Sequence, residues 1–238
     1  MTEFFRFPHT PHLAWLGRGT PRDDKVLTDS EARALLAGEV VIEEKVDGAN
    51  LGISLAADGA LRFQNRGQYL HPPYAGQFQR LAAWVSQHQY ALIDALTPEQ
   101  IVFGEWCAAR HSVAYDRLPD WFVVFDVYDR TAGRFMSTAR RNALAERVGL
   151  MAIPELGHGH TTLPALESRL LTERSRYRNG PIEGFVIRRE TGEWLSSRAK
   201  LVHPEFVQSI GEHWRRRKIE WNRLEDTSGS TGKTGAQP

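Results

Sequence analysis

Cysteine and long apolar runs are the first things the sequence lacks. The 238 residues include one cysteine, Cys107, so no intrachain disulfide and no cysteine-rich zinc site can form. No run of about 18 apolar residues is present, which excludes a membrane-spanning helix. Residues 1–8 lack the basic and apolar regions of a signal peptide. We therefore expect a cytoplasmic protein that makes no membrane contact.

An excess of charge of one sign is also lacking. The chain carries 30 lysine and arginine residues against 29 aspartate and glutamate residues, a net charge of +1. A general basic coat for nucleic acid is therefore excluded, and any nucleic-acid contact must come from a local patch. Hydrophobic residues make up 41% of the chain, which is ordinary for a globular protein and gives enough apolar surface for a core.

The apolar periodicity predicts strands and helices that do not alternate regularly. Short strands are expected over 40–46, 51–55, 101–106, 121–128, 184–189 and 194–202, and helices over 76–95, 138–148, 164–173 and 205–219. Such irregular order favours an α+β domain with antiparallel sheets over a doubly wound fold. We expect one domain over 1–225 with a basic C-terminal helix near 205–223. The end, 226–238, is rich in Ser, Thr and Gly, and we expect it to be disordered.

A lysine lies where an apolar strand meets a tight turn. Residues 43–50 read EEKVDGAN, so Lys45 stands beside carboxylates and just before an Asp-Gly pair. The same pattern is also typical of a hairpin with a solvated lysine. If the amine is to attack an electrophile, it needs a lowered pKa or a cationic neighbour, such as a metal ion or a second lysine.

Charged residues recur at the ends of later apolar segments. The sequence reads NRG at 65–67, FGE at 103–105, FD at 125–126, EGFV at 183–186 and RAK at 198–200. The last segment places two cations on one face of a strand, because side chains two residues apart point the same way.

Together these motifs resemble those of the covalent nucleotidyltransferases, which comprise ATP-dependent RNA and DNA ligases and mRNA capping enzymes. The EKVDGAN start, the FDV strand and the KLVHPEF ending look most like RNA ligases of the nick-sealing type. The resemblance implies an antiparallel-sheet nucleotidyltransferase domain, the ATP-grasp-like ligase adenylylation fold. We expect no OB-fold, because residues 203–238 cannot supply its five strands.

The resemblance also implies a reaction in three steps. Lys45 attacks the α-phosphate of ATP and becomes a lysine–AMP adduct. The AMP then moves to a 5′-phosphate on RNA, and a 3′-hydroxyl displaces it to join the ends. Each step moves a charged phosphoryl group, so Mg²⁺ or Mn²⁺ and protein cations must stabilise it.

Residue roles follow from the same resemblance. Lys45, Lys200 and Glu183 are the implied catalytic residues, and Glu183 and Glu105 the implied metal ligands. Nucleotide contacts fall on Glu44, Asp47, Asn50, Arg66, Glu105, Phe125 and Arg198.

Three of these roles have a specific alternative or departure. Phe125 could equally be a core aromatic residue that does not stack on adenine. Arg66 could be an ordinary surface arginine with no contact to the nucleotide or RNA. Arg198 replaces the usual lysine of the family. Arginine keeps the charge but does not readily lose a proton, so Lys200 is the better candidate for work at the α-phosphate.

A basic segment near the C-terminus is a second candidate contact for RNA. Arg66 and the run Arg215, Arg216, Arg217 and Lys218 could bind phosphates, with nearby tryptophans stacking on bases. The alternative for the run is a solvated helix end.

Other functions stay open beside RNA ligation. They are a DNA ligase, a GTP-using capping-type enzyme and a non-catalytic module that binds RNA ends. We expect a monomer that acts on RNA with 5′-phosphate and 3′-hydroxyl ends, alongside an end-healing partner protein where ends need repair.

Overall fold

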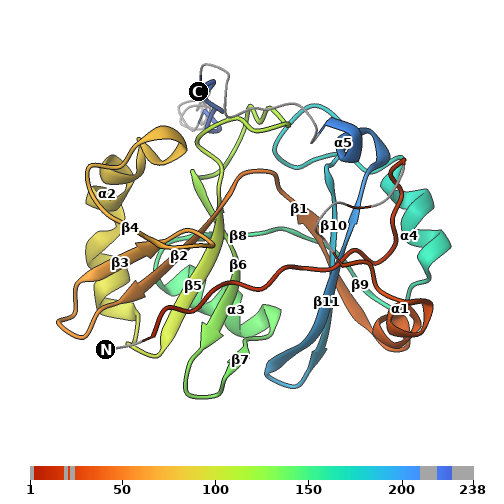
Figure 1. Cartoon of the computed structure of the whole chain (residues 1–238), viewed down its shortest axis with the longest axis horizontal. Helices are drawn as coiled ribbons and strands as arrows, with labels where there is room; N and C mark the ends of the chain where they lie inside the picture. The colour runs from red at the N-terminus through yellow and green to blue at the C-terminus, as the bar shows by residue number, and fades with distance from the viewer. Residues whose placement is uncertain (1–2, 19–20, 22–24, 210–218, 227–238) are drawn as a thin grey trace, which may run out of the picture.

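Two β-sheets stand side by side, with helices on their outer faces (Figure 1). The structure is a computed structural model that describes residues 3–18, 21, 25–209 and 219–226. One sheet has four strands in the order β11-β10-β1-β9, and the other has seven, β4-β3-β2-β5-β6-β7 with β8 beside β6. All pairs except β6–β8 are antiparallel. The predicted α+β class is confirmed.

The four-stranded sheet packs against two helices. Its strands are β1 (Val40–Lys45), β9 (Glu155–Gly159), β10 (Gly184–Thr191) and β11 (Trp194–Val202), and its helices are α1 (Asp29–Leu36) and α4 (Leu163–Leu170). Phe185, Ile187, Ala199 and Leu201 point into this core. Because side chains alternate along a strand, Val186, Arg188, Arg198 and Lys200 face the other way, toward the second sheet.

The seven-stranded sheet is the larger half. Its strands are β2 (Ala49–Leu55), β3 (Leu61–Gln64), β4 (Tyr69–Leu70), β5 (Gln100–Trp106), β6 (Phe122–Asp129), β7 (Arg134–Phe135) and β8 (Met151–Ala152). One face forms the main core with α2 (Leu81–Ala95) and α3 (Thr138–Arg147). A one-turn helix, η1 (Gly76–Phe78), precedes α2, and α5 (Pro204–Ser209) follows β11.

Most predicted elements form, with three differences. The helix predicted over 76–95 is divided into η1 and α2. The glycine- and histidine-rich stretch at 155–159 had no strand predicted, yet it pairs with β1 as β9. The helix predicted near 205–223 begins as α5 and its residues 210–218 lie outside the described residues, but 219–223 are not helical, because Trp221 forms an isolated β-bridge with Ala109. The tail expected over 226–238 lies outside the described residues from 227 onward.

A β-bulge changes the face of two residues in β6. Gly104 pairs with Val124 and Phe103 with Asp126, so Phe125 is an extra residue between two rungs of the ladder. A bulge interrupts the alternation of side chains. Phe125 and Asp126 consequently both turn toward the four-stranded sheet, while Phe122, Val124 and Val127 stay in the main core.

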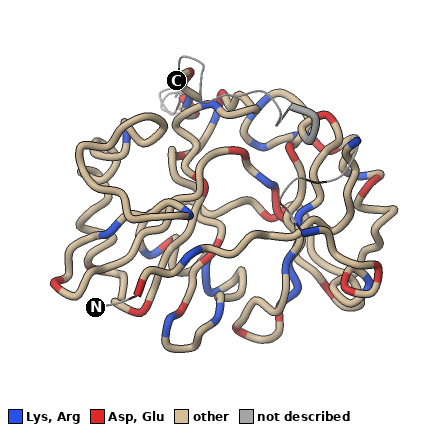
Figure 2. The backbone as a smooth tube through the Cα atoms, viewed as in Figure 1, with Lys and Arg blue, Asp and Glu red and all other residues tan. Residues whose placement is uncertain are grey.

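Charges of both signs are spread along the whole backbone (Figure 2). No helix among the described residues is long and apolar enough to cross a membrane. Acidic and basic side chains nevertheless meet between the sheets, where the functional candidates lie.

Motif glycines permit close contacts between strands. A Cβ on Gly48 would lie 2.6 Å from the carbonyl oxygen of Trp106, and one on Gly104 would lie 2.6 Å from that of Val123. Real Cβ atoms do not approach backbone oxygens so closely, so the glycines let the turn after Lys45 and strand β6 pack directly on β5.

We predict that Gly104→Ala lowers the free energy of unfolding by about 1–3 kcal/mol, because the added methyl overpacks the sheet. Denaturant unfolding measures the loss. Gly67→Ala is the matched control: its Cβ would have only Asn65 Oδ1 nearby, at 3.7 Å, and its change should stay within about 0.5 kcal/mol. Equal stability of both variants would contradict the prediction.

Candidate active site

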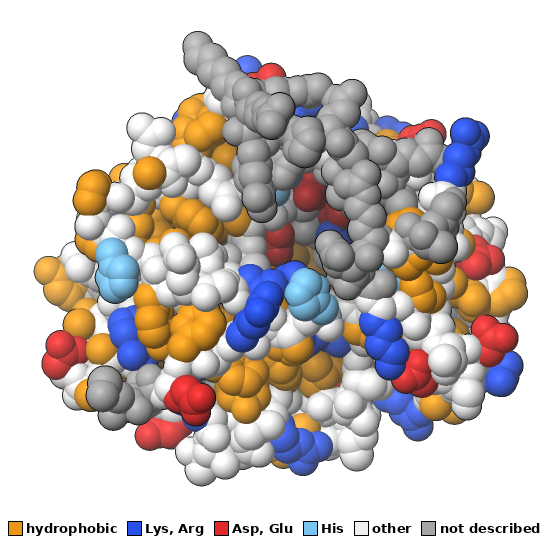
Figure 3. Space-filling model, viewed as in Figure 1, with side chains coloured by type: hydrophobic (Ala, Val, Ile, Leu, Met, Phe, Trp, Pro, Cys, Tyr) orange, Lys and Arg blue, Asp and Glu red, His pale blue; other side chains and the backbone are white. Residues whose placement is uncertain are grey.

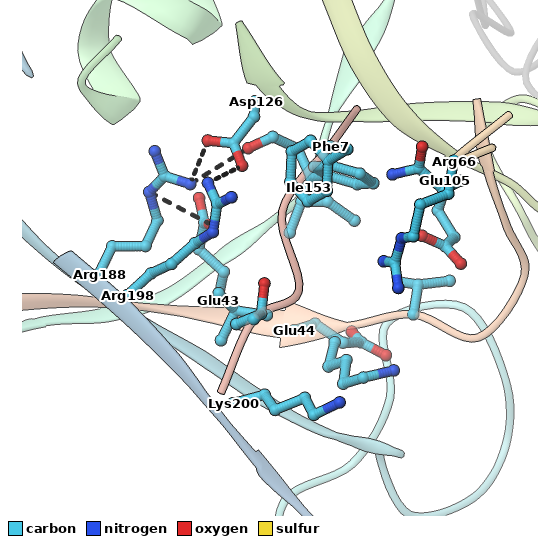
Figure 4. Close-up of a pocket in the computed structure, with 16 residues that line it drawn as sticks. Phe7, Glu43, Glu44, Arg66, Glu105, Asp126, Ile153, Arg188, Arg198 and Lys200 are labelled. Carbon is cyan, nitrogen blue, oxygen red and sulfur yellow. Dashed lines mark hydrogen bonds and ion pairs between the residues drawn. The ribbon is translucent and has the colours of Figure 1, made fainter. Parts of the chain in front are cut away.

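A pocket of about 270 Å³ lies between the two sheets. The surface is hollowed there, and acidic and basic side chains gather around the hollow (Figure 3). Side chains from both sheets converge on it (Figure 4). Eight of the residues proposed from the motifs for catalysis or nucleotide binding line it together: Glu44, Lys45, Asn50, Arg66, Glu105, Phe125, Arg198 and Lys200.

Lys45 ends β1 at the floor of this pocket. Its Nζ donates a hydrogen bond of 2.5 Å to Glu183 Oε1, which comes from the residue just before β10. The pairing of Lys45 with Gly184 across the two strands brings these side chains together. The lysine side chain is 23% exposed and the glutamate 7%, so the ion pair is largely shielded but reachable from the pocket.

The charge on Lys45 is strongly held. Burial by itself lowers the pKa of this amine, but the carboxylates of Glu183, Asp47 and Glu105 outweigh burial, and the net pKa is raised. The protonated form has no lone pair, so this arrangement alone does not make a nucleophile. The sequence had called for a lowered pKa or a cationic neighbour, and a cation that draws the carboxylates away would supply that.

Two carboxylates beside Lys45 hold their protons unusually well. Burial raises the pKa of Glu105 to about 7, although Lys45 opposes the effect, and burial raises the pKa of Glu183 to about 7 in the same way. Glu105 Oε1 also accepts a hydrogen bond of 2.9 Å from the backbone N–H of Gly48. Both carboxylates are therefore desolvated groups that a further positive charge would stabilise as anions.

Some polar atoms at this site have no partner within the described residues. Glu183 Oε2 and both amide atoms of Asn50 are buried without a hydrogen bond. Buried polar groups are normally satisfied, so these atoms fit a ligand with its own donors and acceptors. Glu183 and Glu105 offer the oxygen ligands that Mg²⁺ or Mn²⁺ prefers. No described group of three His, Cys, Asp or Glu residues could hold a metal unaided.

Two residues predicted to contact the nucleotide, Glu44 and Asp47, form hydrogen bonds with neighbouring loops. Glu44 lies at the pocket wall, but its carboxylate accepts hydrogen bonds from Ser175 Oγ (2.6 Å) and the Arg176 N–H (2.9 Å). Asp47 does not line the pocket. Its Oδ2 accepts bonds from the N–H groups of Ser112 (2.8 Å) and Val113 (3.0 Å). Both side chains hold the loops around Lys45 in place.

Phe125 and Arg66 stand on the pocket wall. Phe125 is only partly buried, its bulge turns it into the pocket, and it packs against Phe7 with ring centroids 5.2 Å apart. Arg66 lies near Glu105 (Figure 4), and its Nη1 is 3.4 Å from His9 Nδ1. Phe125 is not fully buried, as a core aromatic would be, and Arg66 is not fully exposed, as a surface arginine would be.

Arg198 has a carboxylate partner that none of the motifs indicated. Its Nη1 donates to Asp126 Oδ2, and its guanidinium lies over the rings of Phe7 and Phe135 at 4.6 and 4.4 Å from their centroids. Arg188 Nη1 binds the other oxygen of Asp126 at 2.8 Å. One carboxylate thus joins two arginines of the four-stranded sheet to β6.

The same cluster continues away from the pocket. Arg141 of α3 lies 2.6 Å from Glu43 of β1, and Arg188 Nε lies 3.8 Å from the second oxygen of Glu43. Arg141, Arg188, Asp126 and Glu43 are each at most 2% exposed. Because buried charges are costly unless paired, the ionic cluster Glu43, Asp126, Arg141, Arg188 and Arg198 strongly restricts how the sheets can sit together.

The structure therefore sorts the predicted residues. Arg215, Arg216, Arg217 and Lys218 lie outside the described residues. Sequence reasoning missed several pocket residues: Phe7, Thr10, Glu43, Asp126, Ile153, Val186 and Arg188. Asp126 is the second residue of the FD motif and Arg188 lies two residues beyond EGFV, so a charged side chain predicted inside a buried strand could have revealed them. Phe7 and Thr10 lie far from any motif and gave no such signal.

Two facing sheets enclose a strand-end lysine among carboxylates and cations, as the resemblance to covalent nucleotidyltransferases led us to expect. A family model described as RNA ligase matches residues 38–202, which contain all six motifs from EEKVDGAN at 43–50 to RAK at 198–200. The chain belongs to the RNA ligase family. No curated protein matches it.

Solved structures share the fold. A mutant Naegleria gruberi RNA ligase with ATP and Mn is 14% identical with a TM-score of 0.60, covering 87% of this chain and 59% of its own. An archaeal ATP-dependent RNA ligase is 19% identical with a TM-score of 0.55, covering 83% and 48%. A putative ATP-dependent DNA ligase from Aquifex aeolicus is 18% identical with a TM-score of 0.51, covering 84% and 50%. The chain thus spans about half to three-fifths of these structures.

We predict that Asp126→Asn lowers the free energy of unfolding by about 3–5 kcal/mol, because two buried guanidiniums lose their carboxylate. Glu220→Gln is the control: it removes a 2.5 Å ion pair with Arg110 whose side chains are 65% and 44% exposed, and should cost at most about 1 kcal/mol. Denaturant unfolding compares them, and a loss below 1 kcal/mol for Asp126→Asn would refute a structural role for the cluster.

Proposed function

We propose that the protein is an ATP-dependent RNA ligase that uses Lys45 as its nucleophile. The observation that carries the proposal is the position of Lys45, at a strand end inside the pocket and bonded to Glu183, in a chain of the RNA ligase family. A site with a buried amine, two carboxylates and nearby cations suits transfer of a nucleotidyl group.

Lys45 must lose a proton before it can attack. A bond then forms between Nζ and the α-phosphorus of ATP, and the bond from that phosphorus to pyrophosphate breaks. Glu183 and Glu105 would hold a Mg²⁺ or Mn²⁺ ion, whose charge offsets the phosphates and favours release of the lysine proton. Their raised pKa values, near 7, support this role, because a cation stabilises both as anions.

The pocket offers the nucleotide one apolar wall and one polar wall. We assign the adenine to Phe125 with Ile153 nearby, and the ribose to Asn50 and Glu105, which face each other across β2 and β5. Arg66 is placed to contact either the ribose or an RNA phosphate. Glu44 and Asp47 act by fixing the loops around Lys45, which refines their expected role as direct contacts.

The two cations of β11 have different proposed roles. Lys200 lines the pocket, and its positive charge favours the ionised form of Glu183, so we assign Lys200 to the α-phosphate. Arg198 is bound by Asp126 and stacked on two rings, so it shapes the wall more than it grips phosphate. Arg198→Lys would keep the positive charge but lose the planar contacts of the guanidinium. The substitution should therefore impair the site more than conservation of charge suggests.

The substrate and setting follow as parts of the same proposal. The enzyme joins RNA with 5′-phosphate and 3′-hydroxyl ends during RNA repair, as a monomer with residues 1–225 as its catalytic domain and with an end-healing partner where ends are damaged. A single buried cysteine suits the reducing cytoplasm. The basic residues at 215–218 are a further candidate contact for RNA.

We predict that Lys45→Ala abolishes labelling of the protein by radiolabelled ATP with Mg²⁺ or Mn²⁺, because no other amine occupies the strand end. Denaturing gels measure the label. The variant should still join RNA that already carries a 5′-adenylate, since that step needs no lysine. Labelling at the wild-type level would remove Lys45 as the nucleophile.

The same incubation separates the alternatives. Label from ATP but not GTP supports a ligase over a capping-type enzyme, and sealing of nicked RNA over nicked DNA identifies the polynucleotide. A wild-type protein that takes no label from either nucleotide would support a module that only binds RNA ends.

We predict that Glu183→Ala and Lys200→Ala each slow ligation by at least about 100-fold, the usual loss when one preorganised charge is removed from a phosphoryl-transfer site. Single-turnover rates measure the effect. Arg62→Ala, which changes a cation outside the pocket, is the control and should keep the wild-type rate. Near-normal rates in both pocket variants would make these residues structural.

A further inference from the structure

An N-terminal strap, residues 5–13, crosses the front of both sheets (Figure 1). It lies entirely outside the segment 38–202 that matches the RNA ligase family model. Nothing in the motifs therefore assigns it a role, yet two of its residues, Phe7 and Thr10, line the pocket.

One end of the strap is fixed to the seven-stranded sheet. The Phe5 carbonyl accepts a hydrogen bond of 2.8 Å from Gln64 Nε2, and the Phe5 ring stacks on Tyr128 with centroids 3.7 Å apart. Phe7 is buried against Phe103 of β5, at 4.8 Å between ring centroids. The strap thus covers the face of this sheet that α2 and α3 leave open.

The other end is fixed to the four-stranded sheet at Lys200 itself. The backbone N–H of Lys200 donates to the Pro11 carbonyl at 2.9 Å, and the N–H of Leu13 donates to the Lys200 carbonyl at 2.7 Å. Leu13 is buried in the core of that sheet. The backbone of the lysine assigned to the α-phosphate is therefore held by the strap on one side and by β10 on the other.

Between these ends, Phe7 touches two pocket side chains at once. Its ring meets Phe125 nearly edge-on, at an interplanar angle of 65°, and lies 4.6 Å from the Arg198 guanidinium. Phe125 lies on a bulge and is only partly buried, so contacts from outside its own strand decide how its ring is turned. Phe7 is itself only 3% exposed and is well suited to act as that fixed contact.

We propose that the strap is a working part of the nucleotide site, and that Phe7 is a positioning residue that sets the ring of Phe125 for the adenine. The strap also holds the backbone of Lys200 at the opposite wall of the pocket. Since the strap spans both sheets, it fixes the distance between the group that binds the base and the cation that serves the phosphate. This inference rests on the proposed function.

A positioning role for Phe7 predicts a change in nucleotide affinity that differs from a loss of fold. An aromatic contact of this kind contributes about 0.5–1.5 kcal/mol, which corresponds to a change of about 2- to 10-fold in affinity. Phe7→Ala should therefore raise the KM for ATP in lysine adenylylation by that factor and lower kcat less. Phe7→Tyr keeps the ring and should restore the KM.

Phe4→Ala is the matched control. Phe4 precedes the strap, and its ring packs against Tyr69 at 5.1 Å between centroids, away from the pocket. The Phe4→Ala substitution removes a phenyl ring of the same size and should leave the KM for ATP unchanged. Unfolding curves for all variants identify the temperature at which each remains folded, and the kinetics are measured below it.

Calorimetry of ATP binding in a Lys45→Ala background gives a readout without turnover. Weaker binding by Phe7→Ala but not by Phe4→Ala supports the proposal even if labelling is undetectable, whereas absence of label in the wild type counts only against the proposed function. The proposal is overturned if Phe7→Ala binds ATP within 2-fold of the Phe4→Ala control. It is also overturned if Phe7→Tyr binds ATP as weakly as Phe7→Ala. If Phe7→Ala does not fold, Phe7→Leu, which fills the space without a flat ring, takes its place with the same criteria.

Discussion

The carboxylate of Asp126 is the interaction on which the geometry of this protein depends most. It binds Arg188 and Arg198 of the four-stranded sheet while standing on β6 of the other sheet. Burial makes an unpaired charge costly, so a shift of one sheet against the other would leave guanidiniums without partners. Asp126, Arg188 and Arg198 all line the pocket, so this charge pairing helps to set its dimensions.

A second constraint concerns the charge on Lys45. Proteins that need a nucleophilic amine often bury it among apolar groups, whereas here three acidic side chains surround it and favour the ammonium form. The ion pair with Glu183 holds the amine in one position. Under the proposed function, what binds in the pocket also activates the lysine, so that substrate binding and activation are one event.

The sequence predicted the parts of the fold that depend on local pattern and failed where distant residues meet. Strand periodicity located β1, β5, β6, β10 and β11, and the residues proposed from the motifs make up 8 of the 16 that line the pocket. The bulge at Phe125, the pairing of Glu43 with Arg141 and the strap through Phe7 depend on register and on tertiary contact. No spacing in the chain encodes those directly. Strand β9 was missed because glycines weaken strand propensity and pairing with β1 overrides it.

The bulge in β6 places the aromatic wall of the pocket and the ionic joint on consecutive residues, Phe125 and Asp126. In a regular strand these side chains would point to opposite faces and could change independently over evolutionary time. Here any change of backbone at the bulge moves both together. Under the proposed function, the contact with the base and the ionic joint between the sheets therefore depend on the same piece of backbone, and change in one is limited by the other.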